Sequence, residues 1–104
     1  EPRAAATPGA LAEVGRLADE GAYAQGLELL VSLDATSADA SKWEGVLRLN
    51  LGEPPAAIDC FRRCVYLDPE NVEYRRWLAV AYEAAGMSRE AARERRNARE
   101  LGVQ

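Results

Sequence analysis

Matching residues recur 34 positions apart along this sequence, and that spacing limits the folds open to the chain. The matching pairs are Gly52 and Gly86, Trp43 and Trp77, Ala57 and Ala91, Cys64 and Ala98, and Leu67 and Leu101. A period of this length is typical of stacked helix hairpins, in which each repeat buries its apolar face against the next. The sequence therefore predicts an array of repeated helix pairs.

Apolar residues at helical spacing, separated by glycine and proline, predict six helices and no strands. We expect helices at about 8–20, 23–33, 38–51, 54–67, 71–85 and 88–101. Thr7 should cap the first helix and Thr36 or Ser37 the third, while Pro54 suits a first helical turn. Short links make successive helices antiparallel neighbours. The predicted fold class is all-α, with three stacked antiparallel hairpins.

Each hairpin carries small, aromatic and glycine residues at set positions. In the third hairpin they are Leu78, Ala79, Tyr82, Gly86, Ala91, Ala98 and Leu101; in the second, Gly45, Gly52, Ala57, Phe61, Leu67, Asp68 and Pro69; in the first, Gly21, Tyr23, Gly26, Leu27 and Leu30. With these residues the sequence resembles the tetratricopeptide repeat family, whose fold is a right-handed α-solenoid. The resemblance implies three repeats within 8–102, at about 8–34, 38–68 and 71–101, a linker at 1–7 and a tail at 103–104.

In such a solenoid the first helix of each hairpin lines a concave groove that binds a peptide or partner protein. The predicted groove residues are Lys42, Trp43, Val46, Asn50, Glu73, Arg76, Trp77 and Val80. Lys42 and Arg76 lie one repeat apart, each beside a tryptophan, and this arrangement suits an acidic partner with apolar side chains. The alternative is that both tryptophans pack between hairpins and that the two cations are only solvated.

The chain has two cysteines and no histidine, so it lacks the usual acid–base residue and the commonest metal ligand. Cys60 and Cys64 lie four positions apart on one predicted helix. No further cysteine or histidine completes a zinc site, and successive helical turns suit a disulfide poorly. We therefore expect packed, reduced thiols, a cytoplasmic location, and no catalytic, metal or cofactor site.

The net charge of −4 is unevenly spread, with −5 over residues 1–41 and +1 over 42–104. This balance argues against nucleic-acid binding, which needs concentrated positive charge. No apolar run approaches the ~20 residues of a membrane span. The last helix mixes arginine with glutamate. It is either a basic strip for an acidic partner or a solvated cap with ion pairs along its surface, and we favour the cap. Its predicted inward residues are Ala91, Ala92, Ala98 and Leu101.

Residues 61–69 and 95–98 are similar to the repeats appended to some bacterial chemoreceptor methyltransferases, which use S-adenosylmethionine. This similarity implies a non-catalytic docking domain, cut from a longer protein, that binds a chemoreceptor or another signalling protein. The alternative is a scaffold or adaptor unrelated to methylation. Homodimerisation through the groove or an end hairpin also stays open.

Overall fold

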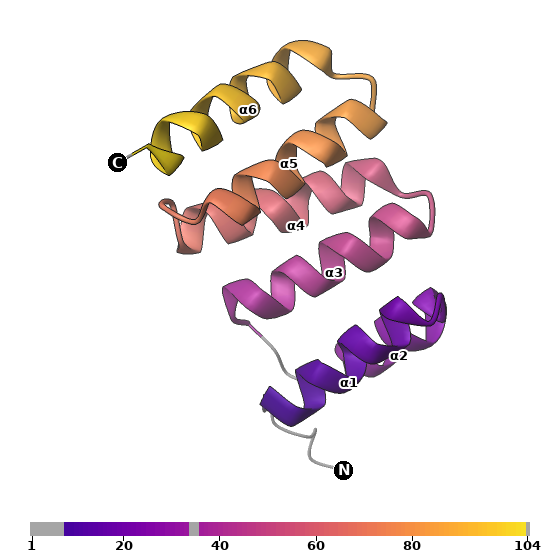
Figure 1. Cartoon of the computed structure of the whole chain (residues 1–104). Coiled ribbons are helices and arrows are strands. Elements are labelled where there is room, and N and C mark those ends of the chain that lie inside the picture. The colour runs from indigo at the N-terminus through magenta and orange to yellow at the C-terminus, as the bar shows by residue number, and fades with distance from the viewer. Residues whose placement is uncertain (1–7, 34–35, 104) are drawn as a thin grey trace.

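The computed structural model describes residues 8–33 and 36–103, and within them the chain forms six helices (Figure 1). The helices are α1 Pro8–Asp19, α2 Tyr23–Ser32, α3 Ala38–Asn50, α4 Pro54–Leu67, α5 Val72–Ala84 and α6 Ser88–Gly102. They confirm the predicted all-α class, with helix ends that differ by a residue or so. The predicted linker at 1–7, with its Thr7 cap, lies outside the described residues, as does Gln104 of the predicted tail.

Local sequence explains where these helices begin and turn. The Ser37 side chain accepts a hydrogen bond from the Ala40 N–H at 3.1 Å, and Asn71 does the same for the Tyr74 N–H at 3.1 Å. Asn71 is therefore the cap of α5 and not its first residue. Each hairpin turns at a glycine with φ near +79°, a conformation that other residues enter only with strain. The three turns sit at Gly21, Gly52 and Gly86.

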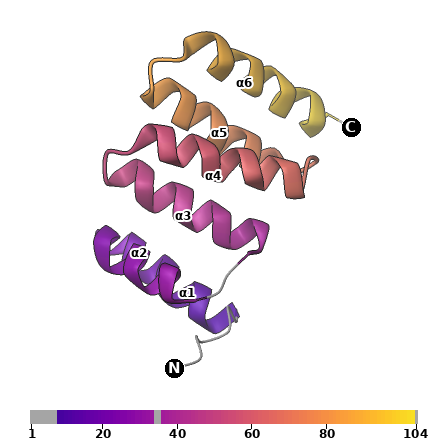
Figure 2. The same cartoon turned by 180° about the vertical axis from the view of Figure 1, so that it is seen from behind.

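The helices stack in chain order as antiparallel hairpins, α1 with α2, α3 with α4, and α5 with α6 (Figures 1 and 2). Neighbouring hairpins pack through α2 against α3 and α4 against α5, and α1 also touches α3. The stack therefore has the first hairpin at one end and α6 at the other. No helix in the described ranges is long and apolar enough to cross a membrane.

Two groups of buried side chains hold the stack together. The aromatic cluster joins the second and third hairpins, and its largest members are Phe61, Tyr74 and Tyr82. The aliphatic cluster joins the first and second hairpins, and its members are Val14, Ala18, Leu30, Leu33, Ala40 and Leu47. Trp43, on α3, packs against both clusters. It therefore links the two halves of the core.

Candidate protein-binding groove

Two adjoining cavities form a groove across α1, α3 and α5, which we call the α1–α3–α5 groove. The first has a volume of about 640 Å³ and lies between α1 and α3; the second has about 360 Å³ and reaches α5. Both are lined by Asp19, Lys42 and Trp43, so they meet around the Lys42 and Trp43 side chains. Most of the lining residues belong to the first helices of the three hairpins, and Tyr23 at the start of α2 also contributes.

Trp43 lies at the centre of the groove because the facing residue of α1 is a glycine, which leaves room for the indole ring. An added Cβ on Gly15 would lie 2.9 Å from Cζ2 of the indole and 3.1 Å from Cη2, so only glycine lets the ring sit this close to α1. The ring is partly buried against both core clusters and also lines both cavities. Trp43 is therefore both a packing residue and a component of the groove surface.

Trp77 has the same double role in the next repeat. Its ring stacks on Phe61 with centroids 5.6 Å apart and an interplanar angle of 14°. Phe61 is fully buried, so it fixes Trp77 on the side of the indole ring that faces the core. Trp77 also lines the second cavity with Trp43. The two sequence hypotheses for the tryptophans, core or groove, are therefore not exclusive.

Lys42 is held by three neighbours instead of pointing freely into solvent. Its Nζ lies 4.2 Å from the centroid of the Trp43 ring, 3.4 Å from Oδ1 of Asp39 and 3.9 Å from Oε1 of Glu73. The side chain keeps 16% of its exposure. The predicted contact of a cation with an indole is present. The Lys42 charge, however, is already balanced by two carboxylates.

Carboxylates outnumber basic groups along the groove. Asp19, Asp39 and Glu73 line it, against Lys42 and Arg16. Arg16 is itself bonded to Glu13 on α1 and to Glu20 just after it, and its hydrogen bonds with Glu13 lower the pKa of that carboxyl. Asp19 makes no ion pair within the described residues. The groove is therefore acidic at its surface.

Six of the eight predicted groove residues line the second cavity: Lys42, Trp43, Val46, Asn50, Glu73 and Trp77. Of these, Val46 is mostly buried in the aromatic cluster, and the Asn50 side-chain amide donates to the Val46 carbonyl at 2.8 Å. Arg76 and Val80 line neither groove cavity. Arg76 therefore does not join Lys42 in lining these two cavities, although the two residues lie one repeat apart in sequence. Asp19 and Tyr23 were not predicted from sequence, and the fold of the first hairpin brings them to the same cavity.

The cysteine pair packs inside the protein. Cys60 and Cys64 are free and buried, and the Cys64 thiol donates to the Ala38 carbonyl at 3.2 Å. Burial, with the Glu44 carboxylate nearby, raises the pKa of Cys60 to about 12, and burial raises the pKa of Cys64 to about 11. The predicted packing of both thiols is confirmed. Within the described residues no three His, Cys, Asp or Glu side chains gather as a metal site.

The last helix differs from its prediction in two ways. Ala91 and Ala98 are buried as expected and Leu101 partly so, but Ala92 is exposed and the inward position belongs to Glu94. Glu94 keeps only 7% exposure and accepts a hydrogen bond from Arg75 of α5 at 3.1 Å. Among the described residues of α6, no ion pair joins residues three or four positions apart along the helix. The expected surface pairs are therefore absent there, and Arg95 instead bonds Glu83 of α5 at 3.1 Å.

Comparison with known proteins finds likeness in structure. No family model and no curated protein sequence matches the chain. MamA MSR-1 matches with 27% identity and a TM-score of 0.81, covering 90% of this chain and 56% of that one. MamA AMB-1 matches with 26% identity and a TM-score of 0.81, covering 90% and 57%. MamA 41-end from Desulfovibrio magneticus RS-1 matches with 21% identity and a TM-score of 0.84, covering 90% and 55%.

These matches show the fold. MamA is a tetratricopeptide-repeat protein, and the six helices of this chain pack pairwise in the same arrangement. The chain spans a little more than half the length of these MamA chains. Nothing in the matches supports a methyltransferase context. The general function that goes with the fold is interaction with other proteins.

Proposed function

We propose that this chain is a non-catalytic scaffold that binds an extended segment of a partner protein in the α1–α3–α5 groove. The observation that carries the proposal is the continuous groove itself, which crosses three helices and is lined by Trp43 and Trp77. Tryptophans on a rigid helical surface are favourable anchors for apolar side chains of a partner. Likeness to MamA supports a scaffold or adaptor over a docking domain for a methyltransferase.

The charges of the groove favour a basic partner segment over the acidic one expected from sequence. Lys42 is balanced by Asp39 and Glu73, and Arg76 lines neither of the two cavities. Asp19 lines both cavities and is not engaged by any basic group in the described residues. A lysine or arginine of the partner beside Asp19, with an apolar neighbour against Trp43, matches this surface. Complementary charge of this kind sets specificity and association rate.

Selection from a display library of random 12-residue peptides tests the proposal. The immobilised 104-residue chain should enrich peptides that combine lysine or arginine with apolar residues. Synthesised peptides from this group should bind at least tenfold more weakly to the Asp19→Asn, Glu73→Gln variant, because it removes two of the carboxylates that line the groove. Fluorescence anisotropy with labelled peptides gives the affinities.

A matched control makes the result specific to the groove. Glu28→Gln with Asp59→Asn removes the same charge from exposed positions on α2 and α4 that line neither groove cavity. This variant should bind the basic peptides as tightly as the parent does. Equal loss in both variants, failure to enrich any basic peptide, or failure to enrich any peptide at all would overturn the proposal.

A further inference from the structure

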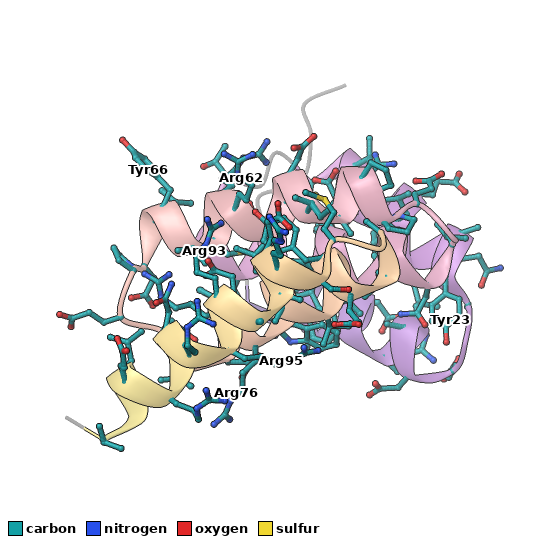
Figure 3. All side chains as sticks on the ribbon, turned by 90° about the horizontal axis from the view of Figure 1, so that it is seen from above. Tyr23, Arg62, Tyr66, Arg76, Arg93 and Arg95 are labelled. Carbon is teal, nitrogen blue, oxygen red and sulfur yellow. The ribbon has the colours of Figure 1, made fainter. Side chains whose placement is uncertain are left out.

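A second hollow, on a different face from the groove, collects arginines. It has a volume of about 270 Å³ and lies where α4, α5 and α6 meet. Arg62 and Tyr66 reach it from α4, Arg75 from α5, and Arg93 and Glu94 from α6. Figure 3 shows Arg62, Tyr66 and Arg93 above Arg76 and Arg95 in that view. We call this hollow the arginine pocket, and it shares no residue with the α1–α3–α5 groove.

The arginine pocket carries positive charge that the fold does not use. Arg75 is committed to structure, since its guanidinium donates to Glu94 at 3.1 Å and to the Pro69 carbonyl at 3.2 Å. Glu94 balances Arg75, and Arg93 lies farther from it, at 3.7 Å. Arg62 makes no ion pair within the described residues. Three guanidiniums against one carboxylate leave the pocket with excess positive charge for an external anion.

The floor and rim of the pocket are suited to a peptide. Leu78 and Tyr82 are buried beneath it and Val65 is partly buried, so part of its base is apolar. Tyr66 stands at the rim and is 82% exposed, which is unusual for a large aromatic residue. Tyrosine and arginine are among the residues most enriched at binding hot spots. An apolar side chain over the base, flanked by carboxylates, fits this combination.

We propose that the arginine pocket binds an acidic segment of a partner protein, in which aspartate or glutamate flanks an apolar residue. The carboxylates pair with Arg62 and Arg93, and the apolar residue lies over Leu78 beside Tyr66. Arginine suits such contacts because its planar fork binds carboxylates in two-point fashion. A nucleic acid is a poorer occupant, since the whole chain carries −4 and its first 41 residues −5, which repels a long polyanion.

The test uses the intact chain and the same random 12-residue display library, eluted at high salt to recover charge-dependent binders. A class of peptides rich in aspartate and glutamate, with an apolar residue, should emerge. These peptides should bind at least tenfold more weakly to Arg62→Glu, Arg93→Glu. Both positions are on exposed helix surfaces, and circular dichroism should show an unchanged helix content. Tyr66→Ala should weaken binding without any change in charge.

A control variant with the same charge change separates local contact from long-range attraction. Arg76→Glu with Arg99→Glu alters two arginines outside the pocket, so it should keep affinity within about threefold. Equal loss in both double variants would overturn the proposal. So would binding of a single-stranded 20-nucleotide DNA in place of peptides. Sedimentation showing self-association that Arg62→Glu, Arg93→Glu abolishes would assign the pocket to a second copy of the chain and overturn it as well.

Discussion

Large aromatic rings fill the core between the second and third hairpins, whereas small aliphatic side chains fill the core between the first and second. Phe61, Tyr74 and Tyr82 are the largest members of the aromatic cluster, and Val14 and Leu30 belong to the aliphatic one. Each buried aromatic removes about 150–250 Å² from water, more than a valine or leucine can. The first hairpin is therefore the more weakly held end of the stack, and the groove crosses the junction between the two halves.

This difference has a consequence for binding. The groove needs α1 on one side and α5 on the other, so it exists only while the first hairpin stays docked on α3. Trp43 packs against both clusters. In repeat proteins stability is close to a sum of units and their interfaces, so an end unit can open by itself. Partner binding should accordingly stabilise the first hairpin most.

The largest expected effect comes from emptying each cluster in turn. Phe61 and Val14 are both fully buried. Phe61→Ala should lower the free energy of unfolding by about 3–5 kcal/mol and Val14→Ala by about 2 kcal/mol, because the ring leaves the larger cavity. Urea denaturation followed by circular dichroism measures both. If Phe61→Ala does not fold, Phe61→Leu serves instead, with an expected loss of about 1–2 kcal/mol. Equal losses at the two sites would remove the distinction between the clusters.

Two helical glycines sharpen the same comparison. An added Cβ on Gly45 would lie 2.6 Å from two atoms of the Phe61 ring, which is fully buried and cannot move aside. The same change at Gly15 meets Trp43, which is only partly buried and can shift. Overpacking costs about 1–3 kcal/mol, while alanine in a helix gains up to about 1 kcal/mol over glycine.

Gly45→Ala should therefore lower the free energy of unfolding by about 1–2 kcal/mol net, and Gly15→Ala should leave it within about 0.5 kcal/mol. Gly15→Ala should still displace the indole, which a shift in tryptophan fluorescence would reveal together with weaker binding of groove peptides. A loss at Gly15 as large as that at Gly45 would mean that Trp43 is held as rigidly as Phe61.

Local sequence signals predicted most of the fold, and long-range pairing accounts for what they missed. Turn glycines such as Gly52, with positive φ, are visible in sequence because each acts within its own few residues. Burial of Glu94 was missed because its partner Arg75 belongs to another helix, and a helical pattern alone places glutamate in solvent. The tryptophans were predicted as core or groove, and only the packing of three helices around them shows that they are both.

The acidic character of the groove did have a signal in the sequence. Asp39 lies three positions before Lys42 on the same helix, and Glu73 is its counterpart 34 residues later. Carboxylates at those positions stack on one face beside the lysine, just as matching residues of a repeat array do. The expectation of an acidic partner came from the cations alone, without these neighbours. The position of Asp19 in the groove could not be predicted from the repeat spacing, because the first hairpin departs from the 34-residue period.

The turn glycines give a smaller effect that tests whether the halves unfold together. Gly21 and Gly86 have nearly the same φ, and neither would bring a new Cβ near any atom. Alanine at either site should cost about 1 kcal/mol through backbone strain alone. Amide hydrogen exchange shows which helices each substitution destabilises. Gly21→Ala should speed exchange in α1 and α2 only, while Gly86→Ala should speed it in α4, α5 and α6. Identical exchange patterns would show that the stack opens as one unit.

The smallest effect is a dependence on alkaline pH that belongs to the second and third hairpins, where α4 carries Cys60 and Cys64 and α5 carries Tyr74. Burial raises the pKa of Cys60 to about 12 and of Cys64 to about 11, from 9.0, and it raises the pKa of Tyr74 to about 12, from 10.0. A raised pKa means that the folded state keeps the proton more tightly, so this stability is fully present below pH 9 and is lost as pH rises toward 12. The described members of the aliphatic cluster include no ionisable side chain.

Urea denaturation at pH 8, 9, 10 and 11 should show a progressive loss of unfolding free energy. The double variant Cys60→Ala, Cys64→Ala should make this dependence on pH shallower, whereas Val14→Ala should leave it unchanged. If the loss of stability with pH is the same with and without the two cysteines, the thiols must reach solvent before the protein unfolds. The core around them would then be less tightly packed than its stacked rings indicate.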